Sequence, residues 1–126
     1  MKTIEWLVIG SLLIGPTALA QEPNPYIGTW QVSMVNNQGG SVKGKVIINS
    51  QDGTWDMFWQ STREPCAGIK APIMIKRASA NKLVFKILRS ESLKGCKNHV
   101  AKLKPVDETT LHGKLNDGRE LTLVRE

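Results

Sequence analysis

The chain is poor in the residues that build metal centres and many catalytic sites. Its 126 residues include two cysteines and two histidines, and His99 and His112 stand at no spacing typical of zinc ligands. No serine lies in a Gly-x-Ser-x-Gly turn of the hydrolase type, and the adjacent acids Asp107 and Glu108 fall in an expected turn. We therefore expect no metal, no cofactor and no catalytic residue, and we interpret the chain as a protein that is not an enzyme.

Long apolar runs are also scarce, with one exception at the start of the sequence. Residues 1–20 combine Lys2, a short apolar stretch and a small-residue ending, Ala-Leu-Ala, which is typical of a cleaved secretory signal peptide. The alternative is a membrane anchor, but the stretch is shorter than the roughly 20 residues that a membrane-spanning helix needs. We expect a periplasmic or secreted protein that begins at Gln21 and has no membrane span.

Two cysteines are few, but an even number in an oxidising compartment favours a disulfide bond. A bond between Cys66 and Cys96 closes a loop of about 30 residues, which stabilises a fold by roughly 3.5 kcal/mol in the chain-entropy model. It also leaves no free thiol to act as a nucleophile. We predict that this pair forms a structural disulfide.

Acidic residues are outnumbered by basic ones, and the formal net charge is +6. Loss of the signal peptide removes one lysine and one glutamate, so the charge does not change. Outside the cytoplasm such a charge favours an acidic protein or an anionic envelope component as partner. The chain has no basic-aromatic motif of the kind that binds single strands, so we expect no nucleic-acid partner.

Helical periodicity is missing as well, and the period of two that is typical of strands runs through the chain. After an extended arm at 21–27, residues 28–126 suffice for one domain with one core. The dipeptide Asp52-Gly53 predicts a hairpin turn. Eight strands are predicted, at 28–34, 41–49, 55–60, 73–76, 83–89, 99–104, 110–115 and 120–125.

Eight consecutive strands with short connections predict an all-β fold, an antiparallel up-and-down barrel. Closure of the sheet favours the barrel because it removes two exposed edges. An immunoglobulin-like sandwich and a barrel of the oligonucleotide-binding type are the alternatives. The interior of an eight-stranded barrel is either filled by side chains or holds one small ligand.

The two ends of this domain carry a pair of short motifs. Gly28-Thr29-Trp30 opens the first strand, and Arg125 lies in the last one. The pair resembles the calycin pattern shared by lipocalins, fatty-acid-binding proteins, avidin-like proteins and small bacterial metalloproteinase inhibitors. The resemblance implies a lipocalin-like barrel in which Trp30 closes one end and Arg125 packs across its ring, a contact that contributes about 0.5–2 kcal/mol. Gly28, Trp30 and Arg125 are then structural.

Candidate binding residues lie in the middle of the chain. Trp55 and Trp59 share the inward phase of one predicted strand, where they fill the core or line a pocket for an apolar or planar ligand. Phe58 lies in the opposite phase, and an exposed aromatic side chain between polar neighbours can mark a surface that contacts a protein.

Basic residues flank the two cysteines. Arg63 precedes Cys66, and Lys94 and Lys97 surround Cys96; a disulfide makes such loops rigid, and rigid loops lose less entropy on binding. We expect a small binding protein that contacts another protein, as an inhibitor or adaptor, through these loops or the outer face of the barrel. The alternative is a binder of a small hydrophobic ligand that uses the interior near Trp55. The partner, the choice between inhibitor and carrier, and the oligomeric state are open at this point.

Overall fold

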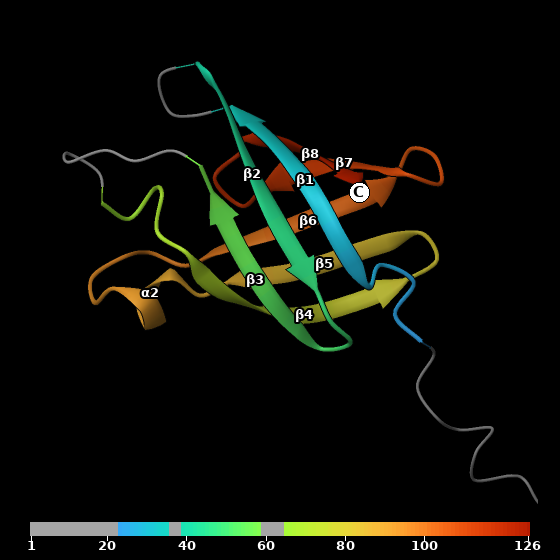
Figure 1. The fold of residues 1–126 in the computed structure, drawn as a ribbon, viewed down its shortest axis with the longest axis horizontal. Coiled ribbons are helices and arrows are strands. Elements are labelled where there is room, and N and C mark those ends of the chain that lie inside the picture. The colour runs from blue at the N-terminus through green and yellow to red at the C-terminus, as the bar shows by residue number, and fades with distance from the viewer. Residues whose placement is uncertain (1–22, 36–38, 59–64) are drawn as a thin grey trace, which may run out of the picture.

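The computed structural model describes residues 23–35, 39–58 and 65–126 of the chain. In this part, eight antiparallel strands follow one another around a closed barrel, and the last strand pairs with the first (Figure 1). The predicted barrel is confirmed, and the sandwich alternative is wrong. The predicted signal peptide at 1–20 lies outside the described residues.

Short turns follow β2, β4, β6 and β7, and one helical turn, α2, lies in the connection from β5 to β6. No helix in the described part of the chain is long and apolar enough to cross a bilayer. The elements are β1 (Gly28–Val35), β2 (Ser41–Ile48), β3 (Asp52–Met57), β4 (Ala71–Ser79), β5 (Lys82–Ile87), α2 (Arg89–Ser92), β6 (His99–Pro105), β7 (Thr110–Leu115) and β8 (Glu120–Arg125).

The hairpin between β2 and β3 is present, but its turn is not where the sequence predicts it. Asp52 and Gly53 both lie in β3, and residues 50–51 make the turn, which Asn49 closes by donating its N–H to the carbonyl oxygen of Asp52 at 2.8 Å. Glycine is required at position 53 for another reason. A Cβ there would collide with the carbonyl oxygen of Ile47 on the neighbouring strand.

Alternate side chains of each strand meet in the interior and form one hydrophobic core. Within it the rings of Trp55 and Phe85 lie side by side, with ring centroids 6.0 Å apart. On the neighbouring strands, Trp55 pairs with Val46 and Ala71, and Phe85 pairs with Ile75 and Ala101. The largest fully buried side chains are Trp30, Trp55, Phe85, Ile48, Ile73, Leu83, Ile87, Leu103, Leu111, Leu121, Leu123 and Val32.

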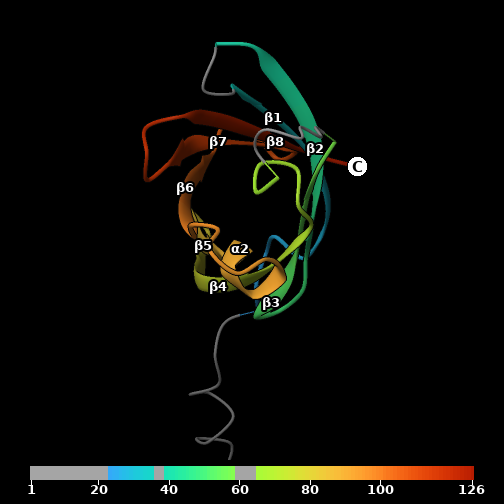
Figure 2. The same cartoon turned by 90° about the vertical axis from the view of Figure 1, so that its left-hand side faces the viewer.

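The barrel has two different ends. The end that we call the tryptophan end contains Trp30, the turns after β2, β4 and β6, and the C-terminus. The opposite end, which we call the disulfide end, contains the connections after β1, β3, β5 and β7 together with α2. Figure 2 looks onto the disulfide end and shows α2 beside the opening of the ring.

Trp30 and Arg125 close the tryptophan end, in the arrangement that the calycin resemblance implies. The Arg125 guanidinium lies 4.3 Å from the centre of the Trp30 ring, and it donates hydrogen bonds to the carbonyl oxygens of Pro25 and Ile27. Gly28 has a φ of 142°, and a Cβ there would lie 3.0 Å from Nη1 of Arg125. The glycine therefore permits both the backbone conformation and the approach of the guanidinium.

Candidate functional site

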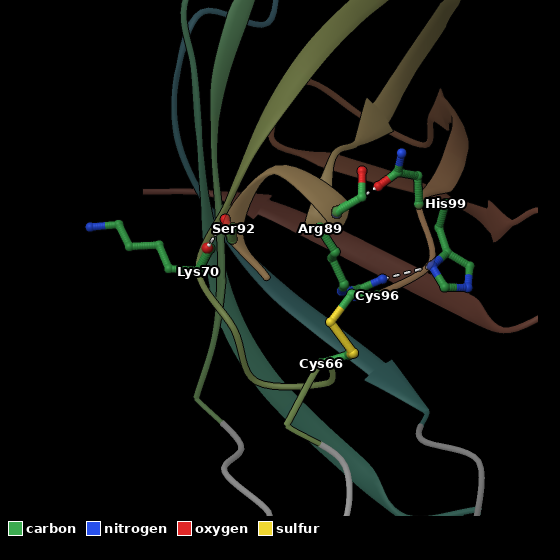
Figure 3. The surroundings of a disulfide bond; sticks show 8 residues. Cys66, Lys70, Arg89, Ser92, Cys96 and His99 are labelled. Atoms are coloured by element: carbon green, nitrogen blue, oxygen red, sulfur yellow. Dashed lines mark hydrogen bonds between the residues drawn. A yellow bond between two sulfur atoms is a disulfide. The ribbon is translucent and has the colours of Figure 1, made fainter. Parts of the chain in front are cut away.

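A disulfide bond fastens two connections to each other at the disulfide end. Cys66, between β3 and β4, bonds to Cys96, which follows α2 (Figure 3). The predicted pairing is therefore confirmed. Beside it, the hydroxyl of Ser92 donates a hydrogen bond to the carbonyl oxygen of Lys70 at 2.7 Å. These two links hold α2 against the segment that leads into β4.

Arg89 carries a buried charge at the start of α2. Its exposed fraction is 3%, whereas charged side chains are rarely buried without a partner of opposite charge. Its Nη1 donates a 2.7 Å hydrogen bond to Nδ1 of His99 (Figure 3). Its Nε is buried and has no hydrogen-bond acceptor among the described residues. The ion pairs of the described chain do not include Arg89.

A row of polar side chains continues from Arg89 toward the turn between β7 and β8. Because Nδ1 of His99 accepts from Arg89, the ring proton sits on Nε2, which points to Oδ2 of Asp117 at 3.5 Å. Asp117 in turn accepts a 2.8 Å hydrogen bond from Nε of Arg119. Asp117 therefore forms its ion pair with Arg119, and it is connected to Arg89 only through the neutral ring of His99.

The pKa directions in this row follow from burial and from neighbouring charges. Burial lowers the pKa of His99, and the positive charge of Arg89 lowers it further, while Asp117 opposes both. Burial also lowers the pKa of Arg89, and the charge of Arg119 acts in the same direction, although a guanidinium stays protonated. Burial raises the pKa of Asp117, but the hydrogen bonds and charge of Arg119 outweigh it and hold that pKa below its usual value.

We expect the stability of the barrel to fall as His99 is forced to take up a proton. The native state keeps His99 neutral, so below the ordinary histidine pKa of about 6.5 the unfolded chain binds more protons than the folded one. The contribution is complete above pH 6.5 and is lost as the pH falls through the lowered pKa of native His99. Urea unfolding at pH 7.5, 6.5 and 5.5 measures this slope.

The control for this prediction is the second histidine. His99→Gln keeps an acceptor for Arg89 but cannot titrate, so it is expected to reduce the slope between pH 6.5 and 5.5. His112→Gln replaces an exposed histidine that contacts Thr122 and Glu120. We expect this variant to keep the native slope of the unfolding free energy between pH 6.5 and 5.5. An unchanged slope in His99→Gln would contradict the assignment.

In the described part of the chain, the indole Nε1 of Trp55 is a second buried donor without an acceptor. Trp55 pairs with Ala71 at the start of β4. The next residue of β4, Pro72, accepts a 2.9 Å backbone hydrogen bond from Leu88, which directly precedes Arg89. The elements that carry the two donors, β3 and the segment before α2, are thus both hydrogen-bonded to the start of β4.

The aromatic residues named from the sequence divide into two groups. Trp55 faces inward and is completely buried, and Phe58 is 65% exposed, as their alternation predicts. Trp59 lies outside the described residues, so its predicted role stays a prediction.

The basic residues near the disulfide are exposed where they are described. Lys94 and Lys97 both point to solvent on either side of the buried Cys96. Arg63 lies outside the described residues. The disulfide therefore places two exposed ammonium groups beside the end of the barrel that holds Arg89.

Arg89, His99, Asp117 and Arg119 are the residues that sequence reasoning missed. From the sequence, His99 is considered only as a possible zinc ligand, whereas its ring contacts Arg89 and Asp117. A signal for Arg89 was present, because it continues the inward phase of Leu83, Phe85 and Ile87 by one step. An arginine in an inward phase indicates either a buried partner or a binding site.

The chemistry available at the disulfide end is hydrogen-bond donation by cationic and aromatic N–H groups. In residues 23–35, 39–58 and 65–126, histidine, cysteine and acidic side chains form no cluster of three that could hold a metal ion. Buried donors without acceptors are suited to an anionic or carbonyl oxygen from outside the described chain.

Comparisons with known proteins find similar folds but give no information about the site. No family model matches the sequence, and no curated protein matches it. The redesigned β-barrel mFAP1, solved bound to DFHBI, has a similar structure with a TM-score of 0.51 at 15% identity, covering 81% of this chain and 95% of that one. Another redesigned barrel, b11L5F_LGL, has a TM-score of 0.49 at 19% identity, covering 81% and 92%. At such identities the likeness concerns the fold alone.

Proposed function

We propose that this protein is an extracytoplasmic binding protein, not an enzyme, and that its disulfide end binds a small ligand through a carboxylate or a similar anionic oxygen. The observation that carries the proposal is the buried guanidinium of Arg89, whose Nε has no acceptor within residues 23–35, 39–58 and 65–126. A buried donor without a partner costs about 1–3 kcal/mol, and more when it is charged. Such a group is understandable where a ligand supplies the missing acceptor.

The position of the ligand follows from the packing below it. Trp55 and Phe85 are completely buried in the core, and Arg89 begins α2, so we place the ligand between the core and α2. The indole N–H of Trp55, which has no acceptor among the described residues, is the second donor that we assign to this ligand. A planar or apolar body on the ligand suits the aromatic layer beneath.

The proposed location agrees with the covalent structure. The Cys66–Cys96 disulfide is of the kind that forms in oxidising compartments, and residues 1–20 have the pattern of a secretory signal peptide. The Trp30–Arg125 contact supports a relationship to the calycins. Barrels of similar fold can hold a small molecule, as mFAP1 holds DFHBI.

A second candidate function is the binding of another protein, as an inhibitor or adaptor, at the same end. Phe58 is 65% exposed at the end of β3, and Lys94 and Lys97 are exposed beside the disulfide. Aromatic anchors with a basic rim suit an acidic protein surface. In that case an acidic side chain of the partner supplies the acceptor for Arg89.

A matched pair of ligands tests the proposed function. 2-Naphthoate and 2-naphthamide have the same shape and differ in charge, and each can compete with anilinonaphthalene sulfonate for the protein. We expect the acid to bind about 10- to 100-fold more tightly than the amide, as charged hydrogen bonds to a buried guanidinium allow. Arg89→Met should bring the two affinities to within about twofold, while Lys104→Met, an exposed control on β6, should keep the preference.

The stability of the same variants separates a binding role from a structural one. Replacement of a buried, unpaired charge by an apolar residue of similar size is often neutral or stabilising. We expect Arg89→Met to unfold at the same or a higher urea concentration than the native protein while it loses the preference for the acid. Equal binding of acid and amide by the native protein would refute the proposed function.

A further inference from the structure

The strand β4 extends beyond its neighbour β3 at the tryptophan end. β4 pairs with β3 only from Ala71 to Met74, but it pairs with β5 as far as Ser79. The last contact on the β3 side is the hydrogen bond from the N–H of Ile75 to the carbonyl oxygen of Gln51, at 2.9 Å. Beyond it, within residues 23–35, 39–58 and 65–126, the β3 side of Lys76, Arg77 and Ala78 has no strand partner.

The register of β4 changes at the same point. Ile75 pairs with Phe85 and Arg77 pairs with Val84, so Lys76 is an extra residue that makes a bulge. A bulge bends and twists a strand, and here it coincides with the place where β4 leaves β3. The consequence is a short free strand edge that the barrel closure does not use.

A groove runs along this edge. Its walls are the segment before β1, the turn after β2 and the second half of β4, and its volume is about 980 Å³. Met74 is 43% exposed and Ile27 is 49% exposed, so the groove offers apolar surface as well as backbone groups. The described lining residues are Pro23, Asn24, Ile27, Ser50, Gln51, Met74, Ile75, Lys76, Arg77 and Ala78.

The charge of the groove has one sign. Lys76 and Arg77 line it and are exposed, and none of its described lining residues is acidic. The carboxylate of Asp52, opposite Met74 across the strand pair, accepts a hydrogen bond from Asn49. An occupant of this groove therefore meets two cations, apolar side chains and an unpaired strand edge.

We propose that this groove binds an extended, acidic segment of another protein by adding it as a strand to the edge of β4. Main-chain hydrogen bonds to residues 76–78 supply affinity, and alternate side chains supply specificity. Carboxylates on the outer face of the segment pair with the exposed Lys76 and Arg77, and apolar residues on its inner face contact Ile75 and Ile27. This site is at the opposite end from Arg89 and does not depend on the ligand proposed there.

The test uses an eight-residue peptide that alternates valine with glutamate, acetylated, amidated and labelled with fluorescein, in an anisotropy titration of the full-length protein with its disulfide intact. The double variant K76E/R77E is expected to weaken binding about tenfold or more, because it turns two attractions into repulsions. The double variant K102E/K104E makes the same change of net charge on the exposed face of β6 and should change binding by less than about twofold.

A second peptide separates strand addition from simple charge attraction. Methylation of alternate backbone nitrogens preserves the charges but removes the donors that face β4, and it should weaken binding about tenfold. The result that overturns the proposal is the absence of binding by the unmodified peptide, equal binding of both peptides, or equal loss in the two double variants. The expected result is supported further if the amide resonances of residues 76–78 shift on titration.

Discussion

Replacement of Trp55 by alanine is expected to lower the free energy of unfolding by about 3–5 kcal/mol, the range for removal of a large buried aromatic side chain. Trp55 is completely buried in the core, and its ring centroid lies 6.0 Å from that of Phe85. Its partners on the neighbouring strands are Val46 and Ala71, and its removal leaves a cavity beside Phe85 in a core that relaxes only in part. Urea unfolding followed by far-ultraviolet circular dichroism measures the loss.

The control is Trp55→Phe, which removes the indole nitrogen and keeps most of the ring. Because Nε1 of Trp55 has no acceptor among the described residues, its loss should not add to the cost of the smaller ring, and we expect about 1–2 kcal/mol. The same variant should bind 2-naphthoate more weakly if the indole N–H donates to the ligand. If Trp55→Phe were as destabilising as Trp55→Ala, the nitrogen would have a stabilising partner and the account of this donor would be wrong.

Removal of the disulfide is expected to have the second largest effect. The double variant Cys66→Ala and Cys96→Ala opens a loop with a sequence separation of 30 residues, and the chain-entropy model gives a loss of roughly 3.5 kcal/mol. The loss should be local as well as global, since the disulfide and the Ser92–Lys70 hydrogen bond hold α2 against the start of β4. Amide hydrogen exchange should therefore accelerate most in α2 and in residues 65–70.

The same double variant is informative about binding. The site around Arg89 needs α2 in place, whereas the groove along β4 lies at the other end of the barrel. We expect the double variant to lose affinity for 2-naphthoate and to retain its affinity for the acidic peptide under conditions where the barrel is folded. A loss of stability below about 1 kcal/mol, with unchanged exchange in α2, would show that the disulfide does not hold this end.

The fold could be predicted because buried residues recur at regular positions along the sequence. Inward residues such as Val42, Val46 and Ile48 recur with period two, and the closing contact of Trp30 with Arg125 is carried by a short motif. The turn predicted at Asp52-Gly53 was wrong for a related physical reason. The dipeptide Asp52-Gly53 is typical of a turn, but Gly53 is needed because its backbone lies close to the carbonyl oxygen of Ile47 on the neighbouring strand. A local sequence pattern does not distinguish these two uses of glycine.

The candidate site could be predicted only in part, because its members meet through the barrel. Cys66 and Cys96 could be paired by counting cysteines. Arg89 and His99 are ten residues apart on either side of a connection, and Asp117 comes from a different hairpin. Each of the three has an ordinary local explanation, as a strand end, a strand start or a turn. Their contact appears only when β5, β6 and β7 are adjacent.

The most direct measurement of the central claim is the nuclear magnetic resonance of the Nε–H group of Arg89, recorded while 2-naphthoate is added. In the free protein this donor has no acceptor among the described residues, so a bound carboxylate should move its proton resonance downfield and protect it from exchange with water. The account predicts that this shift saturates at the dissociation constant measured by competition. Saturable binding of 2-naphthoate with an unmoved Arg89 resonance would place the ligand elsewhere and contradict the account.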